Sequence, residues 1–171
     1  MAKRILNMTA EEMTHATKSE LIEAIAGSEG RVLASETIGI TIPLLTDVTN
    51  AEFAASMGAD LILLNMFDVQ EPKIMALPEV EKEETVREVK RLTGRMVGIN
   101  LEPVEESYAS DNKETLWEMS AGRYATVENA IQAQKMGVDL IVLTGNPGNG
   151  VSNPAIISSL KAISEAVGEK I

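Results

Sequence analysis

The stretch Asn50-Ala51 … Ala54 … Met57-Gly58-Ala59-Asp60-Leu61-Ile62-Leu63-Leu64 decides the fold, because a second copy of it follows later in the chain. It aligns without gaps on Asn129-Ala130 … Ala133 … Met136-Gly137-Val138-Asp139-Leu140-Ile141-Val142-Leu143, an offset of 79 residues (129 − 50). Each copy predicts a helix with small alanines, a glycine that ends it in the left-handed conformation, an aspartate and then an aliphatic strand. The offset corresponds to two strand–helix units, so the chain is built from repeated units.

Four short aliphatic segments are expected to be strands: residues 31–35, 61–67, 96–101 and 140–144. They lack polar alternation, which is typical of parallel strands that are buried on both faces. Each precedes a helical pattern, at 47–57, 79–92, 126–136 and 153–168, with Asn153 and Pro154 as the expected N-cap and first helical residue of the last. An additional helix is expected before the first strand, from a capping box at Thr9 and Glu12 to Gly27. This alternation predicts right-handed parallel βαβ units.

The predicted fold class is therefore α/β, with an N-terminal helix followed by four βα units of a (β/α)8 (TIM) barrel in a single domain, residues 1–171. A complete barrel takes about 250 residues, and residues 169–171 lie where a fifth strand would begin. Three interpretations stay open: a fragment of a longer protein, a half-barrel that dimerises, and a complete, open, doubly wound sheet. A half-barrel would leave two strand edges and one apolar sheet face exposed, which pairing would cover.

Composition excludes several classes of function. The chain has 15 basic and 26 acidic residues, a net charge of −11 and no cysteine. The negative charge argues against nucleic-acid partners and anionic membranes, and disulfides, thiolate metal sites and cysteine nucleophiles cannot occur. The single histidine, His15, is expected at the surface of the first helix. Without an apolar leader or a run of about 18 apolar residues, a cytoplasmic protein is the simplest expectation.

Polar residues at the predicted strand ends form the first candidate site. In barrels the active site lies at the carboxyl ends of the strands. Glu36 is expected to end the first strand, and alternation directs Asn100 and Glu102 of the third strand to the barrel mouth. The whole set is Glu36, Asn65, Asp68, Asn100, Glu102 and Thr144. Glu36, Asn100 and Glu102 are the candidate catalytic residues, with Glu36 or Glu102 as a general base. Asp68 and Glu102 are candidate ligands for Mg²⁺, which prefers oxygen. The alternative is that these side chains merely cap strand ends.

A glycine-rich loop after the fourth strand is the second candidate. In residues 145–150, glycines allow backbone N–H groups to approach a ligand, and the following helix N-terminus favours an anion. The candidate anion-binding residues are Gly145, Asn146, Gly148 and Gly150, together with Asn65, Thr144 and Arg123. The alternative is a tight turn rich in turn-forming residues.

The long connection at residues 103–125 is expected to be a lid or an inserted helix. It carries Trp117, Tyr108 and Tyr124, as well as Lys113 and Arg123, in a chain with only 3% aromatic residues. Connections of this length in compact domains tend to be functional or disordered, and aromatic residues argue against disorder. A lid would bring Lys113 or Arg123 to an anionic substrate, whereas an inserted helix over residues 113–121 would pack its aromatics on the barrel or on a partner.

The repeated Met-Gly-Ala/Val-Asp-Leu-Ile junction, with residues 37–43, GINLEP at 98–103 and LTGNPGNG at 143–150, resembles an uncharacterised bacterial barrel family labelled phosphoenolpyruvate phosphonomutase-like. The paired acidic residues and the Lys-x-Gly-His-like loop usual in that superfamily do not occur in this chain. The resemblance implies a metal-assisted lyase or isomerase acting on a small phosphorylated or carboxylated metabolite.

The alternative function is a non-catalytic half-barrel module that self-associates or binds a ligand. The expected partners are a small anionic metabolite and either a second copy of the chain or a missing C-terminal half. The 171 residues alone are expected to be inactive, because half of the barrel mouth is absent.

Overall fold

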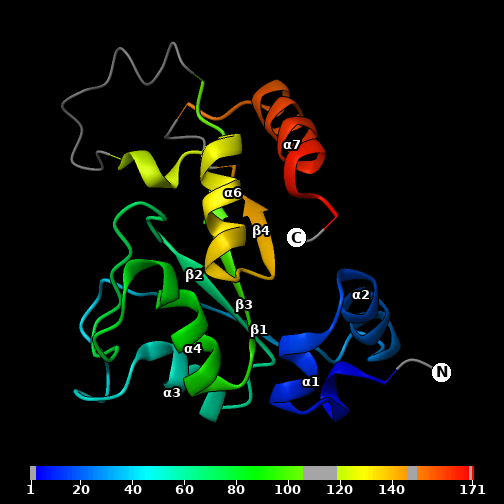
Figure 1. The fold of residues 1–171 in the computed structure, drawn as a ribbon, viewed down its shortest axis with the longest axis vertical. Helices are drawn as coiled ribbons and strands as arrows, with labels where there is room; N and C mark the ends of the chain where they lie inside the picture. Colours follow the sequence, from blue (N-terminus) through cyan, green and yellow to red (C-terminus); the bar gives the residue numbers. More distant parts are fainter. Residues whose placement is uncertain (1–2, 106–118, 146–149, 170) are drawn as a thin grey trace.

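The computed structural model describes residues 3–105, 119–145, 150–169 and 171 (Figure 1). Helices precede and alternate with the strands of one sheet. In chain order the elements are η1 (Ile5–Asn7), α1 (Ala10–His15), α2 (Lys18–Gly27), β1 (Ala34–Ile38), α3 (Asn50–Ser56), β2 (Leu61–Asn65), η2 (Lys82–Glu84), α4 (Thr85–Thr93), β3 (Met96–Leu101), η3 (Ala121–Arg123), α6 (Val127–Met136), β4 (Leu140–Leu143) and α7 (Asn153–Val167). The α/β class predicted from the sequence is thereby confirmed.

The four strands form one parallel sheet in the sequential order β1-β2-β3-β4. Sequential order follows when every βα unit returns the chain to the same side of the previous strand. A doubly wound sheet instead reverses its strand order at a switch point. The observed order therefore argues against the open doubly wound arrangement.

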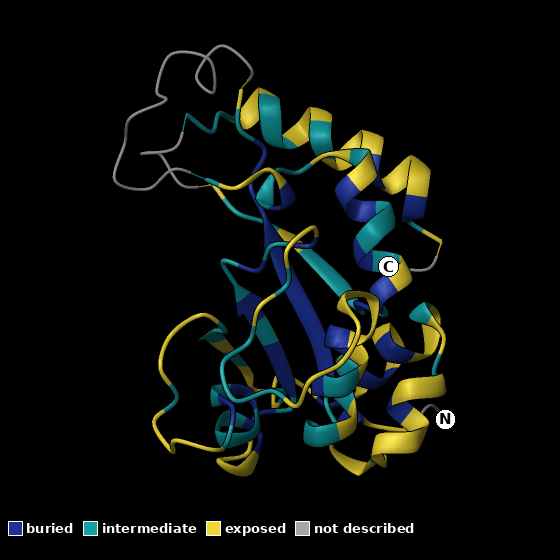
Figure 2. Ribbon diagram, turned by 60° about the vertical axis from the view of Figure 1, so that its left-hand side comes forward, coloured by how far each residue is buried: buried dark blue, intermediate teal, exposed yellow. Residues whose placement is uncertain are grey.

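Strand β3 is buried along its whole length (Figure 2). Its side chains alternate between the two faces of the sheet. On one face Val97, Ile99 and Leu101 pack with Ile62 and Leu64 of β2. The helix residues in the same apolar cluster are Ala51 and Ala55 of α3, Val86 and Val89 of α4, and Ala133 and Met136 of α6. Helices α3, α4 and α6 thus form one layer on this face, and α7 continues it by packing against α6.

The opposite face is covered at its amino end by the N-terminal helices. Leu61 and Met96, which begin β2 and β3, pack with Ile5, Met13 and Leu21. The predicted single helix from Thr9 to Gly27 is wrong, because Thr17 starts a new helix. The capping box at Thr9 is confirmed, and Thr17 forms a second one, in which its side chain accepts the Glu20 N–H and Glu20 bonds back to the Thr17 backbone. A threonine favours the cap over the helix interior because its hydroxyl competes for backbone hydrogen bonds.

The sequence repeat has the same hydrogen bonding in both copies. The Asp60 N–H donates to the Leu33 carbonyl and its carboxylate accepts the Leu33 N–H. Asp139 makes the same two bonds to Val97, at 2.8 Å each. Gly58 and Gly137, before each aspartate, both have positive φ, at 101° and 88°. Each repeat therefore ends a helix with glycine and ties the next strand to the preceding one with aspartate.

Strand β1 is displaced from its prediction. The expected strand at 31–35 is observed at Ala34–Ile38, so Glu36 lies in its middle and does not end it. The bonds from Asp60 hold Leu33 at the entry of the strand, and the residues after it pair with β2. Apolar content did not locate this strand because β1 lies at the edge of the sheet, where burial is incomplete.

Other element ends are set by local chemistry. Strand β2 stops at Asn65 rather than residue 67, because Met66 has a φ of 56°. Helix α3 begins three residues after the predicted start, behind a capping box at Thr49. The N-cap of α7 is Ser152, not Asn153. The bounds of β3 and the glycine ends of α4 and α6 are confirmed. Within the described ranges, no helix is long and apolar enough to cross a membrane.

We expect Asp139→Asn to lower the free energy of unfolding by about 2 kcal/mol more than Asp60→Asn. Both substitutions weaken the acceptor of one backbone N–H. Only Asp139 also pairs with Lys90, at 2.7 Å, and both side chains of that pair are nearly buried. Asp139→Asn thus leaves a cation without its carboxylate in a dry site. Urea unfolding of both variants measures the difference, and equal losses would contradict the role given to Lys90.

Candidate functional site

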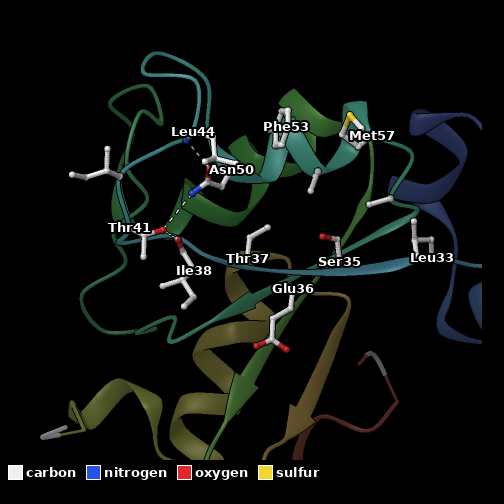
Figure 3. A pocket seen from close by; sticks show the side chains of 13 residues that line it. Leu33, Ser35, Glu36, Thr37, Ile38, Thr41, Leu44, Asn50, Phe53 and Met57 are labelled. Atoms are coloured by element: carbon white, nitrogen blue, oxygen red, sulfur yellow. Dashed lines mark hydrogen bonds between the residues drawn. The ribbon is translucent and has the colours of Figure 1, made fainter. Parts of the chain in front are cut away.

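Predicted site residues lie on the face of the sheet opposite the helix layer. Glu36 pairs in register with Leu63, and Leu63 pairs with Gly98. In Figure 3, Ser35 and Thr37 point toward α3, whereas Glu36 points to the other side of β1. The same alternation places Asn65 and Asn100 on the face that bears Glu36, beyond the part covered by α1 and α2.

Glu36 and Asn65 contact each other across β1 and β2. The Asn65 Nδ2 group donates a hydrogen bond to a carboxylate oxygen of Glu36, and its Oδ1 atom accepts the Met66 N–H at 2.7 Å. The positive φ of Met66 turns the chain so that this second bond forms. Asn65 is thereby held at both ends of its amide, and the exposed carboxylate of Glu36 is oriented by it.

Two buried oxygen atoms near the same strand ends have no hydrogen-bond partner among the described residues. They are Oδ1 of Asn100 and Oγ1 of Thr144. Asn100 is only 8% exposed, and Thr144 is fixed one residue beyond the end of the β3–β4 pairing by the bond from its N–H to the Leu101 carbonyl, at 3.0 Å. A buried acceptor without a partner costs about 1–3 kcal/mol, so this pair is unfavourable for the fold alone.

Glu102 forms an ion pair with Arg123. The Arg123 Nη2 atom lies 2.7 Å from Glu102 Oε1, and Glu102 is only 4% exposed. Backbone hydrogen bonds also join the two segments. The Glu102 N–H donates to the Arg123 carbonyl and the Ala125 N–H donates to the Glu102 carbonyl, both at 2.9 Å. Glu102, predicted as a base and metal ligand, thus holds the connection after residue 119 against the end of β3.

Asp68 is also engaged by that connection. Its Oδ1 atom accepts the N–H groups of Gln70 and Glu71, at 2.7 and 2.9 Å. Burial alone would raise the pKa of Asp68, but hydrogen bonds from the Ser120 hydroxyl and these N–H groups, with Arg123 nearby, hold it below its ordinary value. Only glycine fits at 122, because a Cβ there would lie 1.8 Å from the Asp68 carboxylate.

A preformed acidic metal cluster is not found in the described part of the chain, where no three or more of the Asp, Glu and His side chains gather suitably. The two predicted ligands, Asp68 and Glu102, already hold N–H groups and a guanidinium, respectively. A metal at either carboxylate would compete with these donors.

Part of the predicted anion loop lies outside the described residues, including Asn146 and Gly148, as do Tyr108, Lys113 and Trp117 of the long connection. Of the flanking positions, Gly145 and Gly150 are described. At the start of α7, the Ser152 side chain accepts the Ala155 N–H and donates to the carboxylate of Glu105. An acidic side chain therefore already lies beside the helix N-terminus where an anion was predicted.

Two contributors to the site were missed from the sequence. Ser120 and Gly122 support Asp68 from a connection that carries no recognisable motif. Thr37 carries a third buried oxygen without a described partner, but it points to the helix side of β1. A glycine in a single 3-10 turn gives no sequence signal of its close approach to Asp68, so only the fold reveals it.

The chain belongs to the family described as a domain of unknown function (DUF7916), whose model matches residues 6–171. No curated protein matches the chain.

A double-mutant cycle on Glu102 and Arg123 tests the ion pair. We expect Arg123→Gln to cost about 3 kcal/mol of stability, because it leaves a buried carboxylate without its guanidinium. The combined Glu102→Gln, Arg123→Gln variant should lose clearly less than the sum of the two single variants. Chemical denaturation gives all four values, and additive losses would show that the two side chains do not interact.

The stability contributed by Asp68 should depend on pH. Its pKa is lowered in the folded state, so the contribution is complete above the unfolded-state pKa of about 4 and disappears as the pH falls through the folded value. The difference in unfolding free energy between wild type and Asp68→Asn should therefore increase as the pH rises from about 3 to 5. Carboxyl NMR titration checks the cause, because Ser120→Ala should move the pKa of Asp68 upward. A pKa at or above the ordinary value in the wild type would contradict this assignment.

Proposed function

We propose that one part of the sheet is the substrate site of a metal-assisted lyase or isomerase. It is the face opposite the layer of α3, α4 and α6, at the carboxyl ends of β1 to β4. Its substrate is a small phosphorylated or carboxylated metabolite, as in the phosphoenolpyruvate mutase group that the sequence resembles. The observation that carries the proposal is that two buried oxygens, on Asn100 and Thr144, have no hydrogen-bond partner in the part of the chain that the structure describes. Buried polar atoms are normally hydrogen-bonded, and exceptions call for an explanation such as a ligand.

We propose further that the sheet is half of a (β/α)8 barrel. Three features support this: the sequential strand order, the single layer of α3, α4 and α6, and the N-terminal helices at the amino end of the opposite face. In a barrel the face opposite the layer of α3, α4 and α6 becomes the interior, and its carboxyl end becomes the mouth that carries the active site. Glu36, Asn65, Asn100 and Thr144 then line one side of that mouth.

Glu36 is the proposed general base. Its carboxylate is exposed, and the Asn65 amide fixes its direction. A base must lie within hydrogen-bond reach of the proton it removes, so orientation is the first requirement. Asn100 Oδ1 would accept a hydrogen bond from a substrate hydroxyl, and Thr144 Oγ1 would donate to or accept from a neighbouring substrate oxygen.

Arg123 is the proposed partner for the negative charge of the substrate. Glu102 holds one edge of its guanidinium, and the planar group carries further N–H donors suited to carboxylate or phosphate. In this role Glu102 is a positioning residue for Arg123 rather than a base.

Mg²⁺ is proposed to enter with the substrate, because the described residues contain no acidic cluster ready for it. Magnesium commonly binds together with substrate phosphates and water, so substrate oxygens and water would supply most of its ligands here and leave Glu36 as the base. When bound, the metal would neutralise charge on the substrate.

The alternative is a non-catalytic module that self-associates or binds a ligand. The exposed apolar residues at the two edges of the sheet favour self-association. The two functions differ at Glu36, since only catalysis requires its carboxylate. Loss of turnover with retained ligand binding in Glu36→Gln would support the enzyme.

Substituting the unpartnered atoms tests the site without knowledge of the substrate. Asn100→Leu and Thr144→Val should each raise the free energy of unfolding of the ligand-free chain by about 1 kcal/mol, because an unsatisfied buried polar atom is removed. Thr37→Val is the matched control, since Thr37 also has a buried hydroxyl without a partner among the described residues, but on the helix side of β1. It should give the same gain.

Binding then separates the three variants. Titration calorimetry with inorganic phosphate or oxalate, with and without Mg²⁺, should show binding to wild type and Thr37→Val and at least tenfold weaker binding to Asn100→Leu and Thr144→Val. A loss of stability in Asn100→Leu, or unchanged binding by both site variants, would overturn the proposed site.

A further inference from the structure

The outer edge of β1 borders an apolar groove of about 580 Å³ (Figure 3). Its walls are β1, the following loop and α3. They contain Leu33, Ser35, Thr37, Ile42, Leu44, Phe53, Ala54 and Met57, among others. Several of these are widely exposed for apolar side chains, with Met57 at 71% and Ile42 at 84%. Large exposed apolar surfaces of this kind mark interaction sites.

The groove lies where another βα unit would fit. Within the described residues β1 pairs only with β2, so it is one edge of the sheet. Ser35 and Thr37 point from β1 toward α3 in the way that Val97 and Ile99 of β3 point toward the helix layer. Elsewhere in the layer, each helix has a neighbour along the chain, since α3 contacts α4, α4 contacts α6 and α6 contacts α7. Among these described helices, α3 lacks a neighbour on the β1 side.

The opposite edge carries the complementary surface. Strand β4 pairs only with β3 among the described strands, and α7 is the last helix of the layer. Its Ile157 and Leu160 are 54% and 53% exposed, although Ile163 and Val167 on the same helix are buried. One chain thus presents an edge strand with an apolar helix at one end and an edge strand with an apolar groove at the other.

Both surfaces are almost without charge in a chain that is 24% charged. Glu36 is the only charged residue lining the groove, and it points to the other side of β1. The only charged residues in helix α7 are Lys161 and Glu165. The repulsion expected between two copies with a net charge of −11 each is therefore weak at these surfaces, because the acidic residues lie elsewhere.

We propose that two copies of the chain associate head to tail, with β4 and α7 of each copy against β1 and α3 of the other. Parallel pairing of β4 with β1 places α7 beside α3, which repeats the helix–helix contacts within the chain. Four strands from each copy give eight, the number at which a small barrel closes around a packed interior. Twofold symmetry uses both edges of both copies and leaves none open.

Closure would also bring the strand ends of the two copies to a common mouth. The Glu36 edge of one copy would then adjoin the Thr144 edge of the other. The association does not rest on the proposed chemistry, because it depends on the edges of the sheet and the helix layer. Its test therefore measures the mass of the assembly rather than ligand binding or turnover. A negative result for the association would leave the proposed substrate site untouched, and the reverse also holds.

Sedimentation equilibrium of the 171-residue chain, from low to high micromolar concentration, is the test. We expect the wild type to have twice the mass of one chain. Met57→Glu in the groove and Leu160→Glu on α7 should each weaken association at least tenfold, because each places a charge in an apolar contact. Ile22→Glu is the matched control, since Ile22 is 56% exposed on α2, outside both surfaces. Circular dichroism confirms that each variant is folded.

Mixing the two defective variants tests the head-to-tail arrangement. A pair made from one Met57→Glu chain and one Leu160→Glu chain keeps one intact contact and one doubly substituted contact, so the mixture should associate more strongly than either variant alone. The proposal would be overturned by a monomeric wild type or by an open-ended series of assemblies larger than two chains. It would also be overturned if Met57→Glu and Leu160→Glu associate as strongly as Ile22→Glu. A mixture no stronger than its components would also overturn it, because that result indicates contact between like surfaces.

Discussion

The burial of β3 on both faces is the constraint on which the rest of the structure depends. Every second residue, at Val97, Ile99 and Leu101, packs beneath the helix layer. Alternation therefore directs Gly98, Asn100 and Glu102 to the other face. The smallest residue, Gly98, faces Leu140 of β4, where a Cβ would lie 2.7 Å from the leucine side chain. One strand thus fixes the close approach of β4 and the position of the polar residues at its end.

Glycine and aspartate at the helix–strand junctions keep neighbouring strands of the sheet in register. Asp139 ties the entry of β4 to Val97, and Asp60 ties the entry of β2 to Leu33. A register shift of one residue would exchange the two faces of a strand. It would bury polar side chains under the helices and expose the aliphatic ones. The junctions lie at the amino ends of the strands, so these register-fixing hydrogen bonds are at the end of the sheet opposite the candidate site.

The sequence predicted what periodicity and the glycine helix ends determine, and missed several N-caps and the features that depend on tertiary neighbours. The aliphatic strand β3, the repeat and the glycine helix ends were found because each leaves a local pattern. The break at Thr17 was missed because the apolar spacing continues through it. The residues of β1 were misplaced because an edge strand is less apolar. The sequence also did not predict that Asp68 and Glu102 are already engaged in the fold, since Ser120 and Arg123, which contact them, lie far along the chain.

The acidic residues of the candidate site differ in whether other parts of the fold already bind their carboxylates. Glu102 follows β3 and Asp68 follows β2, the two central strands, and both side chains contact the connection before α6, so their charges stabilise the fold. Glu36 lies on an edge strand, and the described hydrogen bond to its carboxylate comes from one side, from Asn65. Whatever covers the β1 edge would remove water from around Glu36 and strengthen its electrostatic interactions. The chemistry proposed for Glu36 and the closure of the sheet are therefore linked through one side chain, although each can be tested without the other.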